Sequence, residues 1–459
     1  MAHLAMFGVD AVSHTLPSLE ILRELVARGH RVSVVNDPHQ RELVEGTGAR
    51  LVPCTSTLPD GDWPSDPIAA MRTFLEDAMQ GLEQVREHFT RDPADLYLAD
   101  IGGYGGRVLA EAQGAPFVQL SPTYVAWEGY AQEVGDQVMA LPGAAQYRAD
   151  FAAWLERAGA TTHDPDAFAG IPPRALALAP RAMQPHADRV DEQRVTFVGP
   201  CIGERADQGS WQRPDGAEVV VLVSLGSSYT DQPDFYRQCL AAFGGRAGWH
   251  LVLQVGRRID LDALGAIPEG VEVHRWVPQM AILREADLFV THAGMGGCGE
   301  GLLTATPMIA VPQDVDQFAN ADTLVGLGVA RRLDTAEASA AALRSAGDEL
   351  LADREIAPTG TEVPRRAGGR AVGEEVELAG DLRQHDAADR ERRERHGAQV
   401  ADQRRIDQHV HRFGGEYDER RQRQPDDAAR ARVGLARWVT RALAHRPILA
   451  AAHRLQSDT

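Results

Sequence analysis

The sequence lacks lysine entirely, and it has few cysteines and no long apolar run. Its four cysteines, Cys54, Cys201, Cys239 and Cys298, lie far apart and form no CxxC pair. This usage excludes a disulfide framework and a cysteine zinc cage, and it fits a reducing, cytoplasmic compartment. The longest apolar runs, such as 219–225, fall far short of a bilayer span, which needs roughly 18 residues. The N-terminus shows no basic stretch followed by an apolar one, so we expect neither a signal peptide nor a membrane span.

The balance of charge disfavours nucleic acid as a partner. All 47 basic residues are arginine, and 66 acidic residues bring the formal net charge to −19. Binding to a phosphate backbone needs a basic face. Hydrophobic residues make up 44% of the 459 residues and charged residues 25%, which is ordinary for a globular protein and excludes a mainly disordered chain.

The amino-acid composition of the chain changes near residue 355. Residues 351–459 hold 21 arginines and 19 acidic residues, with few Ile, Phe or Val. Dense mixed charge and low hydrophobicity predict an irregular, poorly ordered tail over 356–459, with one helix suggested at 428–455. Two explanations stay open. The tail is a genuine extension that binds a partner, or it is a chance translation after a shift of reading frame.

Strands and helices alternate before this boundary. The apolar run 4–9 is typical of a buried strand, leucines recur at helical spacing over 19–26, and 31–35 is the next strand. After a polar segment at 203–216, further strands are predicted at 219–225, 250–255, 271–274, 288–291 and 308–311. Helices are predicted among them at 235–243, 280–286 and 318–327.

This alternation predicts an α/β fold with two Rossmann-like lobes of parallel strands, over 1–205 and 217–355, facing each other across a cleft. Ligands of such sheets bind outside the carboxyl ends of the strands. Residues that directly follow a strand are therefore the first candidates for a site.

The strongest binding signal is a glycine-rich segment that follows the predicted strand 288–291. It reads His-Ala-Gly-Met-Gly-Gly-Cys-Gly-Glu over 292–300. Glycines let the backbone approach a ligand, and the next helix presents free N–H groups to an anion. A diphosphate fits, with His292 as a donor and Glu300 as an acceptor from a ribose hydroxyl. The alternative is a tight turn whose glycines serve packing only.

Neighbouring segments carry groups that suit the rest of a nucleotide sugar. Trp276 offers a flat face for a base, and Gln279 an amide for the base or the ribose. Asp316 and Gln317 suit the vicinal hydroxyls of a sugar, and the serines in 224–228 add donors. Each has a plainer alternative, because a tryptophan at a strand end is usually a core residue and an aspartate often caps a helix.

Together these segments, in this order over 275–329, resemble the family 1 glycosyltransferases of the two-lobed GT-B type, and among them the bacterial macrolide glycosyltransferases. The resemblance extends over about residues 3–350. It implies a UDP-sugar as co-substrate, with uracil stacked on Trp276, the ribose held by Gln279 and Glu300, and the sugar held by Asp316 and Gln317.

The same resemblance implies that the diphosphate is held by His292, Ser227 and the backbone amides of Gly297 and Cys298. Cys298 stands where members of the family usually have Ser or Thr. Since a thiol is a weak donor, binding at this position would rest on the backbone N–H.

The resemblance also implies a catalytic base in the first lobe. His14 opens the first helix, and a hydroxyl acceptor must lose its proton to such a base as the bond to the sugar forms. Asp100, at a later strand end, would orient His14 as an aspartate does in a Ser-His-Asp triad. The implied reaction is a single inverting displacement that needs no metal and no other cofactor. Taken alone, His14 would more often be a capping or surface histidine.

The sequence gives fewer signals for the acceptor-binding residues. Trp63, Tyr124 and Trp127 fall in irregular segments. They would either line an apolar pocket for a large hydrophobic acceptor that carries a hydroxyl, or belong to the core. Asp314 and Asp316 fit a loose DxD pattern, which other glycosyltransferases use for manganese, but the pattern is weak and we expect no metal.

The leading hypothesis is therefore transfer of a hexose, with a lean to glucose, from a UDP-sugar to a hydrophobic small molecule. Two alternatives stay open. A UDP-sugar epimerase would need acid–base groups aimed at the sugar's own carbons, and no such carboxylate cluster is visible. An impaired or auxiliary homologue would bind UDP-sugar or a partner without turnover. No prediction is made for the oligomeric state.

Overall fold

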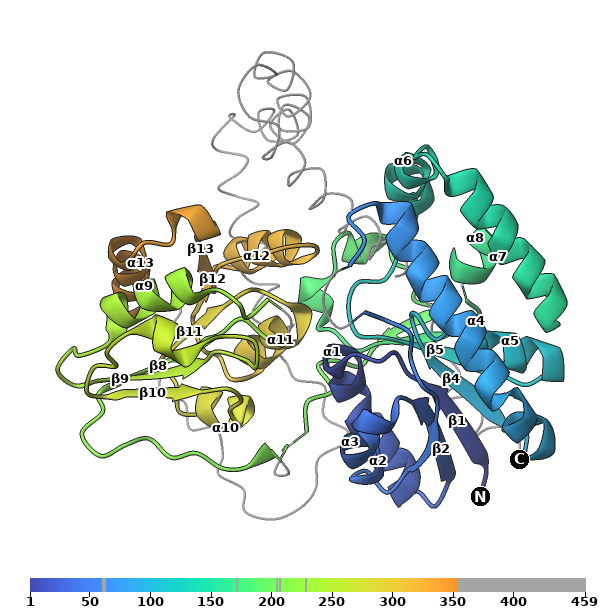
Figure 1. Cartoon of the computed structure of the whole chain (residues 1–459), viewed down its shortest axis with the longest axis horizontal. Coiled ribbons are helices and arrows are strands. Elements are labelled where there is room, and N and C mark those ends of the chain that lie inside the picture. The colour runs from blue at the N-terminus through green and yellow to red at the C-terminus, as the bar shows by residue number, and fades with distance from the viewer. Residues whose placement is uncertain (60–62, 171, 204, 206–207, 228, 353–459) are drawn as a thin grey trace. The chain divides into compact units, whose positions relative to one another are not determined.

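The computed structural model describes residues 1–352 apart from 60–62, 171, 204, 206–207 and 228 (Figure 1). The boundary near 355, the tail over 356–459 and its suggested helix lie outside the described residues. The described chain forms two parallel sheets, and each is covered by helices. Among the described helices, none combines the length and the apolar character that crossing a bilayer requires.

The first sheet has seven parallel strands in the order β3-β2-β1-β4-β5-β6-β7. Its strands are β1 (His3–Phe7), β2 (Arg31–Asn36), β3 (Arg50–Pro53), β4 (Leu96–Asp100), β5 (Phe117–Ser121), β6 (Ala175–Ala177) and β7 (Val195–Phe197). The order reverses direction between β1 and β4, which places the expected ligand crevice at the carboxyl ends of these two strands.

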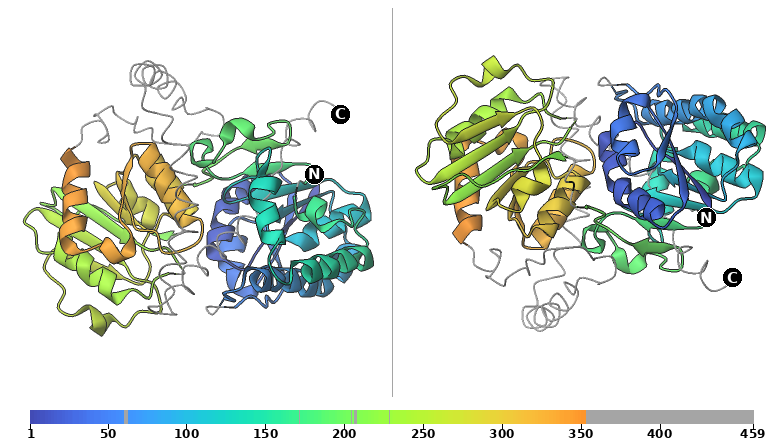
Figure 2. Two further views of the ribbon diagram at one scale, coloured as in Figure 1. Left: turned by 90° about the horizontal axis from the view of Figure 1, so that it is seen from above. Right: turned by 90° about the horizontal axis from the view of Figure 1, so that it is seen from below.

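Helices pack on both faces of this sheet (Figure 2). The helices are α1 (Val12–Thr15), α2 (Leu19–Ala27), α3 (Arg41–Glu45), α4 (Pro67–Arg91), α5 (Tyr104–Gln113), α6 (Asp136–Met139), α7 (Ala144–Ala158) and α8 (Pro165–Gly170). Side chains alternate along β1, so Phe7 packs in the core under α4, α5 and α7, while Met6 packs under α2 and α3. Helix α2 stops at Gly29, whose φ of +84° suits glycine.

The second sheet has six parallel strands in the order β10-β9-β8-β11-β12-β13, which repeats the order of the first six strands of the other sheet. Its strands are β8 (Val219–Ser224), β9 (Trp249–Gln254), β10 (Val271–His274), β11 (Leu288–Thr291), β12 (Met308–Ala310) and β13 (Ala330–Arg332). Here the switch of direction falls between β8 and β11.

Two separate layers of helices cover this second sheet. The helices are α9 (Pro233–Phe243), α10 (Gln279–Leu283), α11 (Met295–Leu303), α12 (Gln317–Gly326) and α13 (Ala340–Ala352). Val221 and Val223 pack in the core with α9 and α13, and Leu222 between them packs in the core with α10, α11 and α12. The prediction of two Rossmann-like lobes is confirmed, and the predicted strands and helices agree with the structure to within a few residues.

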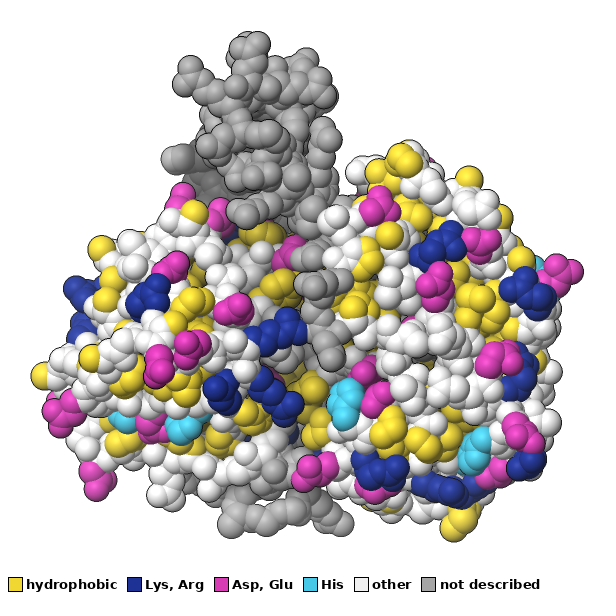
Figure 3. All heavy atoms as spheres, viewed as in Figure 1, with side chains coloured by type: hydrophobic (Ala, Val, Ile, Leu, Met, Phe, Trp, Pro, Cys, Tyr) yellow, Lys and Arg dark blue, Asp and Glu magenta, His cyan; other side chains and the backbone are white. Residues whose placement is uncertain are grey.

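Many arginines in the described part of the chain are surface ion-pair partners. On the face shown in Figure 3, basic and acidic side chains are interspersed. Arg28 lies 2.7 Å from Glu24, Arg41 lies 2.6 Å from Glu45, and Arg332 is 2.6 Å from Asp322. Exposed pairs of this kind stabilise a fold by only about 0–1 kcal/mol each. The fold therefore depends on the apolar cores on both faces of each sheet rather than on these charges.

Candidate active site

One pocket collects side chains from both lobes. The first lobe contributes Ser13, His14 and Thr123. The predicted donor-side residues that line it are Ser227, Trp276, Gln279, His292, Gly297, Glu300, Asp316 and Gln317. The sequence-predicted histidine and the glycine-rich segment therefore face the same space.

His14 and Asp100 form a hydrogen-bonded pair at the switch point of the first sheet. His14 lies in the four-residue helix α1 after β1, and Asp100 is the last residue of β4. The His14 Nδ1 atom lies 3.0 and 3.1 Å from the two carboxylate oxygens. The Asp100 side chain is buried and also accepts from the Gly102 N–H at 3.1 Å. The carboxylate therefore holds a proton at Nδ1, which leaves Nε2 as the basic nitrogen.

The N-terminus of α11 opens into the pocket. Gly294 is its N-cap residue and Met295 to Gly297 form its first turn, and all four line the pocket. The first N–H groups of a helix have no partner within the helix, and the helix dipole adds positive potential there. This end of α11 therefore has the free N–H groups and the dipole that suit an anion.

Cys298 requires a correction. Its N–H donates to the Gly294 carbonyl at 3.0 Å, so the amide is already used inside the helix. Its side chain is fully buried, and burial raises the pKa of the thiol. Cys298 is not among the residues that line the pocket. The amides of the preceding residues, up to Gly297, take the place expected for Cys298.

Two glycines explain how His292 is positioned. A β-carbon on Gly226 would lie 2.6 Å from the His292 ring, and one on Gly294 would lie 2.5 Å from its Nε2. Gly226 also has a φ of +74°, which disfavours any side chain. The imidazole thus sits in a slot that exists only because both residues are glycine.

The groups predicted to hold the nucleoside line the pocket. Trp276 is 50% exposed although it is large and apolar, so it is not the core residue of the alternative interpretation. Glu300 is buried in α11 and accepts from Gln279 and from Arg205. Each oxygen of the Glu300 carboxylate thus has one partner within the protein and a second lone pair that can accept from a ribose hydroxyl.

The acidic and amide pair after β12 also reaches the pocket. Asp316 occupies the N-cap position of α12, yet its side chain makes no capping hydrogen bond to the helix backbone. The capping alternative is therefore excluded for this carboxylate. Gln317 uses its Oε1 to accept from the Gln313 and Asp314 amides at 2.8 and 3.1 Å, which leaves its Nε2 group for a ligand.

Comparison with known proteins agrees with this geometry. Residues 198–357 match the family model "UDP-glucoronosyl and UDP-glucosyl transferase". The chain is 56% identical over 365 residues to oleandomycin glycosyltransferase of Streptomyces antibioticus, which covers 78% of this chain and 85% of that protein. The chain belongs to this family of glycosyltransferases.

Other relatives of this glycosyltransferase share both lobes. The NDP-glycosyltransferase YjiC of Bacillus licheniformis is 29% identical, over 82% of this chain and 97% of that protein. The solved structure of the glycotransferase of kitacinnamycin is 49% identical, with a TM-score of 0.72 over 77% of this chain and 92% of that one. CalG4, the calicheamicin glycosyltransferase, is 27% identical, with a TM-score of 0.67 over 78% and 91%.

The three aromatic residues predicted for the acceptor do not line this pocket of the glycosyltransferase. Trp63 stacks on Phe74, with ring centroids 5.0 Å apart. Trp127 donates to Glu133 at 2.8 Å, and Tyr124 is buried in the apolar core of α10, α11 and α12. None is among the described residues that line the pocket. For Tyr124 the core interpretation is the correct one, because its ring is covered on all sides.

Three polar residues at the site were not predicted. Arg205 lines the pocket from the segment between β7 and β8, Thr123 follows β5, and Asn320 lies one turn along α12. Arg205 is flanked by polar and glycine residues and has no periodic signal. Thr123 and Asn320 stood next to motifs that were recognised, and their polarity within apolar surroundings was the available signal.

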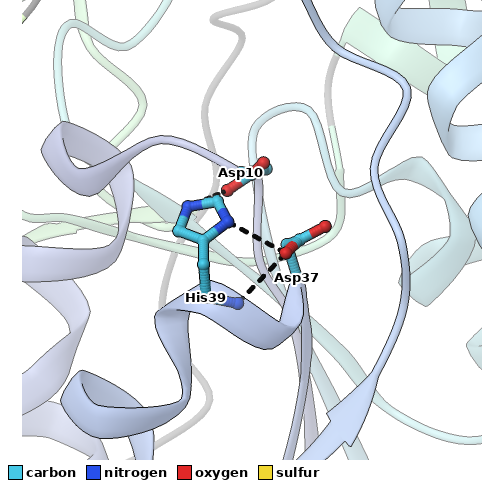
Figure 4. Close-up of side chains that lie close together, drawn as sticks. All are labelled: Asp10, Asp37 and His39. Atoms are coloured by element: carbon cyan, nitrogen blue, oxygen red, sulfur yellow. Dashed lines mark hydrogen bonds and ion pairs between the residues drawn. The ribbon is translucent and has the colours of Figure 1, made fainter. Parts of the chain in front are cut away.

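A second cluster of titratable groups lies in the first lobe of the glycosyltransferase. Figure 4 shows His39 between Asp10 and Asp37, with its two nitrogens each 2.9 Å from a carboxylate oxygen. Burial raises the pKa of Asp10, while hydrogen bonds from His39 and Ser56 lower the pKa of Asp37 against the effect of burial. The spacing could hold a metal ion, but both nitrogens of His39 already lie within hydrogen-bond distance of a carboxylate oxygen. We interpret the cluster as a hydrogen-bonded one.

Proposed function

We propose that this glycosyltransferase moves a hexose, with glucose as the first candidate, from a UDP-sugar to a hydroxyl of a macrolide, with inversion at the anomeric carbon. The observation that carries the proposal is that the His14–Asp100 pair and the open end of α11 line or support one pocket. The 56% identity to oleandomycin glycosyltransferase supports a macrolide acceptor.

His14 acts as the general base in this proposal. The acceptor hydroxyl gives its proton to Nε2 while its oxygen forms the bond to the anomeric carbon. Asp100 keeps the other proton at Nδ1 and stabilises the imidazolium that results. Positioned proton transfer of this kind typically contributes about 10²–10⁴-fold to a rate.

The second lobe stabilises the leaving group. As the bond between the anomeric carbon and the diphosphate oxygen breaks, its electron pair moves to UDP. The first-turn amides of α11, up to Gly297, His292 and Ser227 receive this charge. Such fixed donors need no reorganisation during the reaction. Arg205 is the one arginine among the described residues that line the pocket, and it adds a full positive charge.

The nucleoside and the sugar complete the donor. Uracil stacks on the exposed face of Trp276, and a ribose hydroxyl donates to a remaining lone pair of Glu300, beside Gln279 and Arg205. The sugar hydroxyls donate to Asp316 and accept from the Gln317 Nε2 group.

The proposed reaction requires no metal. Asp314, the first residue of the loose DxD pattern, is buried and accepts from Tyr229 at 3.3 Å and from the Val315 amide at 2.8 Å. That leaves Asp316 alone to face the pocket, and the proposal assigns it to the sugar.

The test is a UDP-release assay with UDP-glucose, with and without oleandomycin, read together with the mass of the acceptor. Acceptor-dependent release and a mass gain of one hexose support the proposal. Release that ignores the acceptor would indicate a hydrolase. Binding of UDP without release would indicate the auxiliary homologue, and an isomerised UDP-sugar would indicate an epimerase. A parallel series with other UDP-hexoses identifies the preferred sugar.

A further inference from the structure

We propose that Asn320 is a positioning residue that ties the end of β5 in the acceptor lobe to both the diphosphate helix and the sugar-binding carboxylate. The proposal rests on the proposed function, because it concerns the same pocket. Asn320 itself does not touch the donor, so it acts through its neighbours.

Asn320 uses both ends of its amide inside the protein. Its side chain is 0% exposed, and a buried amide that is left unpaired is costly. The Nδ2 group donates to the Ala293 carbonyl at 2.9 Å and lies 3.4 Å from the Asp316 Oδ2 atom. The Oδ1 atom accepts from the Tyr124 hydroxyl. One side chain therefore connects three segments that lie far apart in the sequence.

The bond to Ala293 fixes the approach to helix α11. Ala293 has a φ of +59°, which is uncommon for a residue with a side chain, and it stands between His292 and the N-cap Gly294. Such a conformation persists only when its surroundings hold it. By binding the Ala293 carbonyl, Asn320 holds the peptide that sets where the free amides of α11 point.

The contact with Asp316 orients the sugar-binding carboxylate. The Oδ2 atom lies 3.4 Å from Asn320 Nδ2 and 3.4 Å from the Thr123 hydroxyl, so one contact comes from each lobe. These contacts occupy one side of the carboxylate. The other oxygen has no hydrogen bond within the described chain, and it is left to the ligand.

Tyr124 sets the orientation of the Asn320 amide. Its hydroxyl donates to Oδ1, which forces the Nδ2 group toward Ala293 and Asp316. Burial raises the pKa of Tyr124 well above its usual value, so the hydroxyl remains a donor. Tyr124 directly follows Thr123, which lines the pocket. The segment after β5 thus links the acceptor lobe to the donor site through the Tyr124–Asn320 hydrogen bond.

The experiment compares three variants by UDP titration calorimetry and by steady-state kinetics. Asn320→Ala removes the hold on Ala293 and Asp316, so we expect about tenfold weaker UDP binding and a lower kcat, since a hydrogen bond of this kind is worth roughly one factor of ten. Asn320→Asp keeps an acceptor for Tyr124 but places a carboxylate beside Asp316 and the Ala293 carbonyl, so we expect the larger loss. Tyr124→Phe keeps the ring and the Thr123–Asp316 contact and removes only the Tyr124–Asn320 bond, so we expect kcat to fall severalfold with UDP affinity nearly unchanged.

Thr323→Ala is the matched control, because Thr323 lies on the same helix and its hydroxyl only donates to the Ala319 carbonyl at 2.8 Å. It should leave UDP affinity and kcat unchanged. The proposal would be overturned if Asn320→Asp kept the UDP affinity and kcat of the wild type. It would also be overturned if Tyr124→Phe had a lower melting temperature but unchanged kinetic constants. If the wild-type protein binds UDP but transfers no sugar, the proposed function fails, while the UDP titrations still decide the role of Asn320.

Discussion

The two lobes share one strand order but place their chemistry differently. The first lobe presents side chains from regular backbone, since His14 lies in a helix and Asp100 ends a strand. The second lobe presents backbone, namely the free amides at the start of α11 and a slot for His292 made by two glycines. Side-chain chemistry can be removed by substitution without moving the chain, whereas a site built from backbone cannot.

Two residues of the second lobe have a strained backbone conformation. Ala293 after β11 and Val315 after β12 have φ values of +59° and +52°, which is unusual for alanine and more so for a β-branched residue. Both flank groups that face the donor pocket. No residue other than glycine among the described ones that follow β1, β4 or β5 has such a conformation before the next helix. Ala293 and Val315 are two of the five described non-glycine residues with positive φ, so part of the backbone strain lies beside the donor pocket.

The first prediction separates the lobes most sharply. His14→Ala removes the base and leaves the donor lobe untouched, so we expect kcat to fall by about 10²–10⁴-fold. UDP affinity should change by less than about twofold, because His14 contributes no donor contact in the proposed complex. Rate assays and calorimetry on the same preparation check both halves. A variant that kept most of its rate would remove His14 from the mechanism.

Asp100→Asn tests the orientation of the base. The asparagine oxygen can still accept from the Gly102 amide, which would turn its NH₂ group toward His14 Nδ1 and move the ring proton to Nε2. The wrong tautomer cannot accept the acceptor's proton, so we expect a loss of kcat of about 10²-fold or more. Combining this change with His14→Ala should add little further loss, whereas multiplying losses would show that the two residues act independently.

Gly294→Ala tests the donor lobe. The added methyl group would meet the His292 Nε2 atom at 2.5 Å, so either the ring or the start of α11 must move. We expect UDP binding to weaken about 10–100-fold, the range that overpacking of 1–3 kcal/mol gives. Gly326→Ala is the control, because a β-carbon there meets no atom within 4 Å. Equal UDP affinity in the two variants would show that the position of His292 between Gly226 and Gly294 does not matter for UDP binding.

Removal of metal should have a small effect. After treatment with EDTA and buffer exchange, we expect kcat to stay within about twofold, because the proposal assigns charge stabilisation to the α11 amides, His292 and Arg205. Turnover that disappears and returns with Mn²⁺ would assign Asp316 to a metal instead of the sugar.

The smallest effect is expected at the Asp10–Asp37–His39 cluster. His39 is largely exposed, so His39→Gln should lower the melting temperature by about 2 °C or less. Activity should not change, since this cluster takes no part in the proposed reaction. A large loss of activity restored by added Zn²⁺ would identify a metal site.

Sequence reasoning succeeded where a function is local in the chain. The strands and most of the predicted residues that line the pocket lie in short contiguous segments, so period and motif could indicate them. Arg205, Thr123 and Asn320 were missed because their importance depends on which segments meet in three dimensions. Tyr124 was placed at an acceptor pocket because an isolated aromatic gives no sign of the core that covers it. For Cys298, the motif indicated a helix but not that the Cys298 N–H donates within that helix, to the Gly294 carbonyl.

The buried thiol in α11 has a practical consequence. Cys298 has no exposure and its pKa is raised by burial, so it should react with a thiol reagent only when the helix opens away from the sheet. Its labelling rate therefore measures how often α11 unfolds locally. A bound nucleotide that stabilises this helix would lower the labelling rate.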